Sequence, residues 1–353
     1  MNKVTFKVLF ALLFIGNLMV VDGQCLPNGI TFNTQQQIDN FPTNYPGCTE
    51  ILGDIEITGA ITNLNGLSQI VIVGGLVNIH NTSLINLEGL NNLNTIGEDF
   101  IIFNNSSIQN TDGIENLQSI KGELNISGNS SLSEITSFEN ITSLGDGIFP
   151  TDALKIVSNI MVTNIQSLSN LETLNGDCQI KSTSLVNLNA LSNVQTISGK
   201  LEIVFNGILT NIDGLQSINP NEIEYLRITQ NQFLSNCDIN SICEYLNMPD
   251  RSVEIQQNYT GCSSITQVEA ACALGTKENE LSDIKIYPNP TNGTFEISGL
   301  KEGIIEIIDN QGRTVKQMDL GENSYSISDL TTGIYFLKIS SEKSSITKQL
   351  IKT

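Results

Sequence analysis

A unit of 22 to 30 residues recurs nine times between Ile51 and Asn258, and it constrains the fold more than any other feature. Each copy opens with two apolar residues one position apart and continues through a turn rich in Asn and Ser. Period-2 alternation is typical of a strand, and one such unit cannot bury its apolar side alone, so the copies must stack with their strands in a parallel sheet. The alternating pairs are Ile55/Ile57, Val77/Ile79, Phe100/Ile102, Leu124/Ile126, Leu154/Ile156, Cys178/Ile180, Leu201/Ile203, Leu226/Ile228 and Val253/Ile255.

An asparagine follows most of these strands. In that place its amide can bond the backbone of the turn and stack on its counterpart in the next copy, which predicts a structural role and not a ligand site. The asparagines are Asn81, Asn105, Asn129, Asn159, Asn206, Asn231 and Asn258.

The N-terminus has the pattern of a secretory signal peptide. Lys3 and Lys7 precede an apolar run, Val8 to Val21, and small residues flank a cleavage position after Gly23. That run is shorter than the ~18 to 20 apolar residues that a membrane span needs, and no later segment is long and apolar enough. We expect residues 1–23 to be removed, and the chain to be exported without a transmembrane anchor.

Charge is distributed unevenly along the chain. Residues 24–281 contain 7 basic and 27 acidic residues, whereas residues 282–353 contain 8 and 9. Phosphate recognition needs basic stripes, so nucleic acid is excluded as a partner and anionic lipid is a poor one. One His and no Trp leave few residues for general acid–base chemistry.

Six of the seven cysteines gather at the two ends of the repeats, where disulfides in an oxidising compartment would stabilise the weakest parts of a stacked array. Cys25 and Cys48 are expected to pair. Four cysteines at the other end allow three connectivities, of which the repeat alignment favours Cys237–Cys262 with Cys243–Cys272. Cys178 occupies an inward strand position and is expected to be a buried free thiol.

The chain divides into five segments. After the signal peptide, residues 24–50 form an N-terminal cap with a strand at Ile30 to Phe32 and a short helix, and the repeats occupy 51–272. Residues 273–281 are small and polar and are predicted to form a linker. Short alternating segments between turns in 282–353 predict a small antiparallel β-sandwich.

The repeats, with tails such as Asn86-Leu87-Glu88-Gly89-Leu90, resemble the receptor L-domain type of leucine-rich solenoid. This resemblance covers roughly Cys25 to Cys272. It implies a right-handed parallel β-helix with Cys-bearing caps, so the expected fold class is mainly β. Such domains occur in ligand-binding ectodomains and bacterial surface proteins, but no binding residue of theirs maps onto this sequence.

The C-terminus closely resembles the type A sorting domain of the Bacteroidota type IX secretion system. Its matching segments are YPNPTNG, DNQGR, LTTGIYFLKI and a basic end. The resemblance implies contact with that secretion machinery, outer-membrane translocation, and release or attachment to surface lipopolysaccharide, hence an extracellular or cell-surface location. The residues that carry it are Tyr287, Pro288, Asn289, Pro290, Gly293, Gly312, Gly333, Tyr335, Lys348 and Lys352.

Nothing in the sequence forms an active site, and we expect no metal or other cofactor. His80 is expected to be a solitary surface residue, and acid pairs such as Asp54 with Glu56 to be a solvated face and not the paired carboxylates of a glycosidase. Outward strand positions are mostly polar, apart from an apolar group that is expected to be the binding site. Its members are Ile101, Phe103, Val157 and Val204.

These features favour a non-catalytic binding protein whose ligand is an extracellular glycan or protein. Two alternatives belong to other classes: a β-helix lyase or hydrolase acting on carbohydrate, and a structural component of a surface coat. The enzyme would need a cleft lined by carboxylates or basic residues, whereas a surface without one favours binding or structure.

Overall fold

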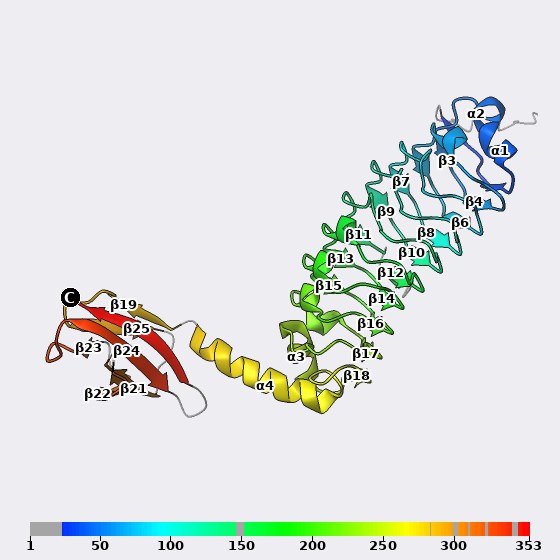
Figure 1. Cartoon of the computed structure of the whole chain (residues 1–353). Helices are drawn as coiled ribbons and strands as arrows, with labels where there is room; N and C mark the ends of the chain where they lie inside the picture. Colours follow the sequence, from blue (N-terminus) through cyan, green and yellow to red (C-terminus); the bar gives the residue numbers. More distant parts are fainter. Residues whose placement is uncertain are drawn as a thin grey trace, which may run out of the picture. The chain divides into compact units, whose positions relative to one another are not determined.

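The computed structural model describes residues 23–145, 152–282, 284–298, 303–309, 311–321, 324–340 and 345–353. All but the last residue of the expected signal peptide, 1–23, lies outside these ranges. The fold is mainly β, as expected (Figure 1). Contacts divide the chain into two compact units, residues 1–178 and 179–353.

The longest sheet has ten strands that follow one another in sequence order. Its parallel register is the one that the repeat alignment predicts: Leu124 lies opposite Phe100 in the first unit, and Leu201 opposite Leu226 in the second. The division between the two units falls inside β14. The strands are β2 (Ile30–Phe32), β4 (Ile55–Thr58), β6 (Val77–His80), β8 (Phe100–Phe103), β10 (Leu124–Ser127), β12 (Asp152–Val157), β14 (Asp177–Lys181), β16 (Lys200–Val204), β17 (Tyr225–Thr229) and β18 (Ser252–Gln256).

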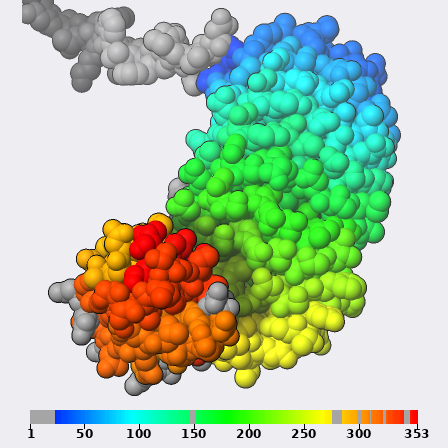
Figure 2. All heavy atoms as spheres, turned by 60° about the vertical axis from the view of Figure 1, so that its left-hand side comes forward, coloured from blue at the N-terminus to red at the C-terminus, as the bar shows by residue number. Residues whose placement is uncertain are grey.

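Between its strand in the long sheet and the next one, each repeat from β4 to β17 forms a short strand, a 3₁₀ turn or both. We call one repeat a coil. Within the first unit, the gradual change from blue to green in Figure 2 shows that consecutive coils are neighbours in space. The two-residue strands of the coils are β1 (Gln24–Cys25), β3 (Glu50–Ile51), β5 (Ile72–Val73), β7 (Thr95–Ile96), β9 (Ser119–Ile120), β11 (Ser143–Leu144), β13 (Thr173–Leu174) and β15 (Thr196–Ile197). Their 3₁₀ turns are η1 (Asn65–Leu67), η2 (Gln166–Leu168), η3 (Asn189–Leu191), η4 (Asp213–Leu215) and η5 (Pro220–Glu222).

A ladder of fully buried asparagines runs through the turns after the long strands. Asn129 Oδ1 accepts a hydrogen bond from Asn105 N at 2.9 Å, and its Nδ2 donates to Ile102 O at 2.9 Å. Asn129 N in turn donates to Asn159 Oδ1 at 2.9 Å. Each amide therefore satisfies backbone groups that have no strand partner, which is the structural role expected from the sequence.

The ladder begins one residue later than predicted. Asn81 is exposed with φ of 52°, and Thr82 is the buried residue that donates from N and Oγ1 to Asn105 Oδ1, at 3.0 and 2.7 Å. Thr183 bonds Asn206 Oδ1 in the same way. A threonine can stand before a ladder asparagine because its N–H and its hydroxyl both donate to that asparagine's Oδ1.

Caps cover both ends of the repeats. At the N-terminal end the helices α1 (Gln35–Asp39) and α2 (Phe41–Asn44) bury Ile38 and Phe41, and a capping box between Thr34 and Gln37 begins α1. At the other end stand α3 (Asn240–Leu246) and α4 (Ile265–Ser282).

The cysteines adopt the expected arrangement. Three disulfides join Cys25 to Cys48, Cys237 to Cys262 and Cys243 to Cys272. Cys178 is free and fully buried, and this burial raises the pKa of its thiol to about 12, which keeps it unreactive.

The expected linker at residues 273–281 is helical instead. It forms the later part of α4, which runs without interruption to Ser282. Polar composition suggested a loop, but Ala, Leu, Lys and Glu are all strong helix formers and no proline interrupts the run.

The C-terminal residues form two antiparallel sheets around a core that includes Phe295, Ile305, Tyr325 and Leu337. One sheet has the order β19-β20-β23 and the other β22-β21-β24-β25. The strands are β19 (Lys285–Tyr287), β20 (Thr294–Ser298), β21 (Gly303–Ile308), β22 (Thr314–Leu320), β23 (Tyr325–Ser326), β24 (Gly333–Ser340) and β25 (Ser345–Lys352).

Candidate functional site

The outer face of the long sheet carries three of the four apolar residues predicted to bind ligand. Phe103 ends β8 and is 41% exposed, Ile101 on the same strand is half-buried, and Val157 ends β12 and is also half-buried. The register places Phe103 opposite Ser127 of β10, and Ser127 opposite Val157. Adjacent strands are ~4.8 Å apart, so the three side chains share a patch about 10 Å across.

Val204, the fourth predicted residue, does not belong to this surface, because it is only 2% exposed. Ser182 N donates to Val204 O at 3.0 Å, which places Lys181 beside it. The Lys181 ammonium reaches Glu202, with 2.7 Å between Nζ and the carboxylate. The same carboxylate lies 3.7 Å from Arg227. Long side chains that cover apolar neighbours explain how an outward position can be buried.

His80 borders the patch and is not the solitary residue that was expected. Its ring centre lies 6.4 Å from that of Phe103. Asn81 Nδ2 lies 2.9 Å from Nδ1, which must accept, so Nε2 carries the proton and donates to Glu56 Oε1 at 3.1 Å. Thr31 Oγ1 donates to the other carboxylate oxygen at 3.0 Å. The hydrogen bonds from His80 and Thr31 hold the pKa of the Glu56 carboxyl below its ordinary value.

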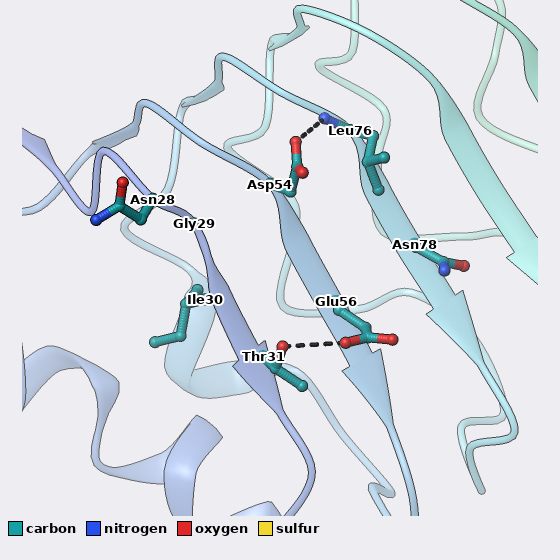
Figure 3. A pocket seen from close by; sticks show the side chains of 8 residues that line it. All are labelled: Asn28, Gly29, Ile30, Thr31, Asp54, Glu56, Leu76 and Asn78. Carbon is teal, nitrogen blue, oxygen red and sulfur yellow. Dashed lines mark hydrogen bonds between the residues drawn. The ribbon is translucent and has the colours of Figure 1, made fainter.

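A cavity of about 410 Å³ lies on the outer face of β2, β4 and β6. Figure 3 shows Thr31, Glu56 and Asn78 side by side on these strands. Asn78 Oδ1 is buried without a hydrogen-bond partner, so the site has an unused acceptor. The lining residues are Asn28, Gly29, Ile30, Thr31, Asp54, Glu56, Leu76 and Asn78.

The two carboxylates of this cavity have different roles. Asp54 Oδ1 accepts the backbone N–H of Leu76 at 3.0 Å, and a Cβ on Gly75 would lie only 2.1 Å from that oxygen. Asp99 and Gly122 repeat the arrangement two coils further on. Asp54 therefore joins adjacent coils, which agrees with the structural interpretation of the acid pair, and Glu56 is the carboxylate positioned at the outer face.

Within the described ranges, no group of three or more His, Cys, Asp or Glu side chains is arranged so that it could hold a metal ion.

The outer face of the second unit is a network of paired charges. Lys181 Nζ lies 2.7 Å from Glu202, and Arg227 lies 3.7 Å from Glu202 and 3.0 Å from Glu254. Tyr225 donates to Glu254 at 2.9 Å, and this hydrogen bond holds the pKa of the Glu254 carboxyl below its ordinary value. Because the acidic and basic side chains neutralise one another here, this part of the sheet does not present a surface of one charge sign.

Glu123 of the first unit differs from these paired acids. It precedes β10, and its Oε1 is buried without a partner. Burial, together with the nearby Asp152, raises the pKa of the carboxyl from 4.5 to about 7, although Lys155 partly opposes the shift. Sequence reasoning missed this residue, because no local pattern marks which charged side chain a neighbouring coil will cover.

A raised pKa in the folded state makes stability fall as the acid ionises. The free energy of unfolding should therefore decline between pH 4.5 and about pH 7 through Glu123. Glu123→Gln should remove this decline, adding about 1 kcal/mol at pH 8 after allowance for solvent screening and almost nothing at pH 4. Urea unfolding of both chains at the two pH values checks it. An equal difference at both would contradict the assigned ionisation.

The expected sorting residues belong to the C-terminal sheets. The Asn289 side chain bonds two backbone groups of β25, donating from Nδ2 to Gln349 O at 2.8 Å and accepting from Ile351 N at 2.9 Å. Lys352 is buried, with its ammonium bonded to Ser328 O and Leu330 O. These residues hold the last strand in place.

The other predicted sorting residues differ in exposure. Tyr335 is buried and its hydroxyl donates to Thr331 O at 2.8 Å, whereas Tyr287 is exposed and Lys348 half-buried. Two of the glycines, Gly293 and Gly312, have the positive φ that other residues rarely adopt. The remaining residues are Pro288 and Pro290, each after a cis peptide bond, and Gly333 at the start of β24.

Residues 285–353 match the family described as the secretion system C-terminal sorting domain. This domain indicates export through the type IX secretion system and a location outside the cell or on its surface. No curated protein matches the chain. Within the described ranges, no helix combines the length and the apolar character that crossing a membrane requires.

Proposed function

We propose that this chain is a non-catalytic binding protein of the cell surface or extracellular space, which engages a glycan or a protein. Residues 24–272 would form a right-handed, leucine-rich solenoid of the receptor L-domain type, followed by the sorting domain at 282–353. In support, the strands of the long sheet follow sequence order, and disulfides stand at both caps.

The exposed ring of Phe103 beside a polar cavity is the observation that carries this proposal. Phe103 and Ile101 form the apolar part of the site, the Glu56 carboxylate that His80 holds in place provides an acceptor, and Asn78 supplies an unused acceptor. Aromatic anchors next to fixed polar groups are typical of recognition surfaces. Asp54 and Glu56 favour a neutral or cationic ligand over an anionic one.

The enzyme alternative has less support than binding. A glycosidase requires two carboxyls that face one substrate bond, whereas Asp54 accepts a backbone N–H and Glu56 is engaged by His80 and Thr31. A purely structural coat component would not need an exposed aromatic ring beside a cavity.

Replacement of Ile101 by Asn and Phe103 by Ser tests the site. The new residues are the ones that β10 already has at the opposite positions, since Asn125 lies opposite Ile101 and Ser127 opposite Phe103. The double variant should therefore keep its strand register and its melting temperature. We expect ligands captured by the wild type on glycan and protein arrays to be lost, since the apolar anchor is gone.

Val71→Ser is the matched control, because Val71 is also an exposed apolar residue but precedes β5 in the other sheet. It should leave capture unchanged. Undiminished capture by the Ile101→Asn, Phe103→Ser variant would exclude this face as the binding site.

A further inference from the structure

A second exposed apolar surface lies on the turns that follow β16, β17 and β18, which we call the turn edge (residues 204–210, 229–235 and 256–262). Phe205, Phe233 and Tyr259 are 55%, 57% and 56% exposed, more than Phe103, and Ile208 is also exposed. Each of three successive turns thus presents one aromatic ring to solvent. Rings left in water in this way commonly mark a contact surface.

The turns are held rigidly beneath these rings. Asn206 N donates to Asn231 Oδ1 at 2.9 Å, and Asn231 N to Asn258 Oδ1 at 3.0 Å. Leu209 and Leu234, each three residues after a ladder asparagine, are fully buried. A contact surface that is already ordered loses little conformational entropy on binding.

The aromatic turns are joined to each other as well as to the core. Phe205 N donates to Thr229 O at 3.2 Å, and Tyr259 N donates to Leu234 O at 3.0 Å. The disulfide between Cys237 and Cys262 joins the last two of these coils. The rings are therefore presented by a connected framework and not by loose loops.

The turn edge contains no charge, although the chain as a whole has a net charge of −20. No Asp, Glu, Lys or Arg occurs from Ile203 to Ile212, from Ile228 to Cys237 or from Ile255 to Val268. The charged residues directly before these stretches, Glu202, Arg227 and Glu254, pair with one another on the strands. The exposed polar groups among the rings are uncharged amides and hydroxyls, including Gln232, Gln257 and Thr260.

We propose that the turn edge binds a neutral polysaccharide. The faces of Phe205, Phe233 and Tyr259 can pack against the C–H faces of sugar rings, and the amides of Gln232 and Gln257 can bond their hydroxyls. The three rings occupy different positions in their turns: Phe205 precedes its ladder asparagine by one residue, Phe233 follows its own by two and Tyr259 by one, so the rings spread over an area of the turn edge. Several rings spread over an uncharged surface suit an uncharged ligand that contains several sugar units. This inference does not depend on the site around Phe103.

Affinity gel electrophoresis of the exported chain, residues 24–353, tests this inference. The gels contain hydroxyethyl cellulose, laminarin, galactomannan or glycogen, with polygalacturonate as the charged comparison. The variant combines Phe205→Gln, Phe233→Ser and Tyr259→Ser. Each new residue already occurs at the equivalent position of another coil, and these equivalents are Gln230, Ser107 and Ser106. We expect at least one neutral polysaccharide to retard the wild type, and the variant to bind it about tenfold or more weakly.

The Ile101→Asn, Phe103→Ser variant should be retarded like the wild type, which separates this surface from the outer face. Equal retardation of the triple variant, or no retardation in any neutral gel, would overturn the proposal, as would stronger binding to polygalacturonate. So would a wild-type dimer that the triple variant abolishes in the absence of sugar. A melting curve shows whether the triple variant folds, and Phe233→Ser alone replaces it if it does not.

Discussion

Removal of residues 282–353 should leave the repeats folded but abolish delivery to the cell surface and medium. The truncated chain is expected to accumulate in the periplasm, because it lacks the domain that directs type IX export. In the described part of the chain, strands β19 to β25 pair only among themselves, so their loss removes no hydrogen bond from the long sheet. Cell fractionation with immunoblotting measures the distribution.

Circular dichroism and disulfide mapping of the periplasmic form provide the control for folding. A reciprocal fusion of residues 282–353 to an unrelated exported protein should carry that protein to the surface. Normal surface levels of the truncated chain would show that the sorting assignment is wrong.

Asn129→Ala should be among the most destabilising single substitutions in the repeats. It leaves Asn105 N–H and Ile102 C=O buried without their partners. Each orphaned backbone group costs about 1 to 3 kcal/mol, so the free energy of unfolding should fall by about 2 to 5 kcal/mol. Urea denaturation followed by far-UV circular dichroism measures this change.

Asn81→Gly is the matched control, since Asn81 has the same residue type but lies exposed with positive φ outside the ladder. Its free energy of unfolding should stay within about 0.5 kcal/mol of the wild type. A loss as large as that of Asn129→Ala would mean that the ladder has no special role.

The strands could be predicted from sequence because their signal is local and repeated. The alternation at Leu124 and Ile126 identified both the strand and its register against Phe100 and Ile102. Elements without such repetition were harder to predict. Residues 273–281 look like a linker by composition, and only helix propensity indicates that they continue α4.

The candidate site could be predicted only in part. Alternation correctly placed Ile101 and Phe103 on the outer face, but it could not show that Lys181 would reach across to Glu202 beside Val204. The pairing of His80 with Glu56 likewise joins residues 24 positions apart on neighbouring strands. Contacts between long side chains of adjacent coils depend on register and rotamer together, and the sequence pattern specifies only the register.

Hydroxyl-radical footprinting of the exported chain, with and without a ligand captured on the arrays, tests the central claim most directly. If the outer face binds that ligand, oxidation of the exposed Phe103 ring should fall sharply at saturation, while that of the distant control residue Val71 should not change. Equal oxidation of Phe103 in the free and saturated protein would contradict binding at this face.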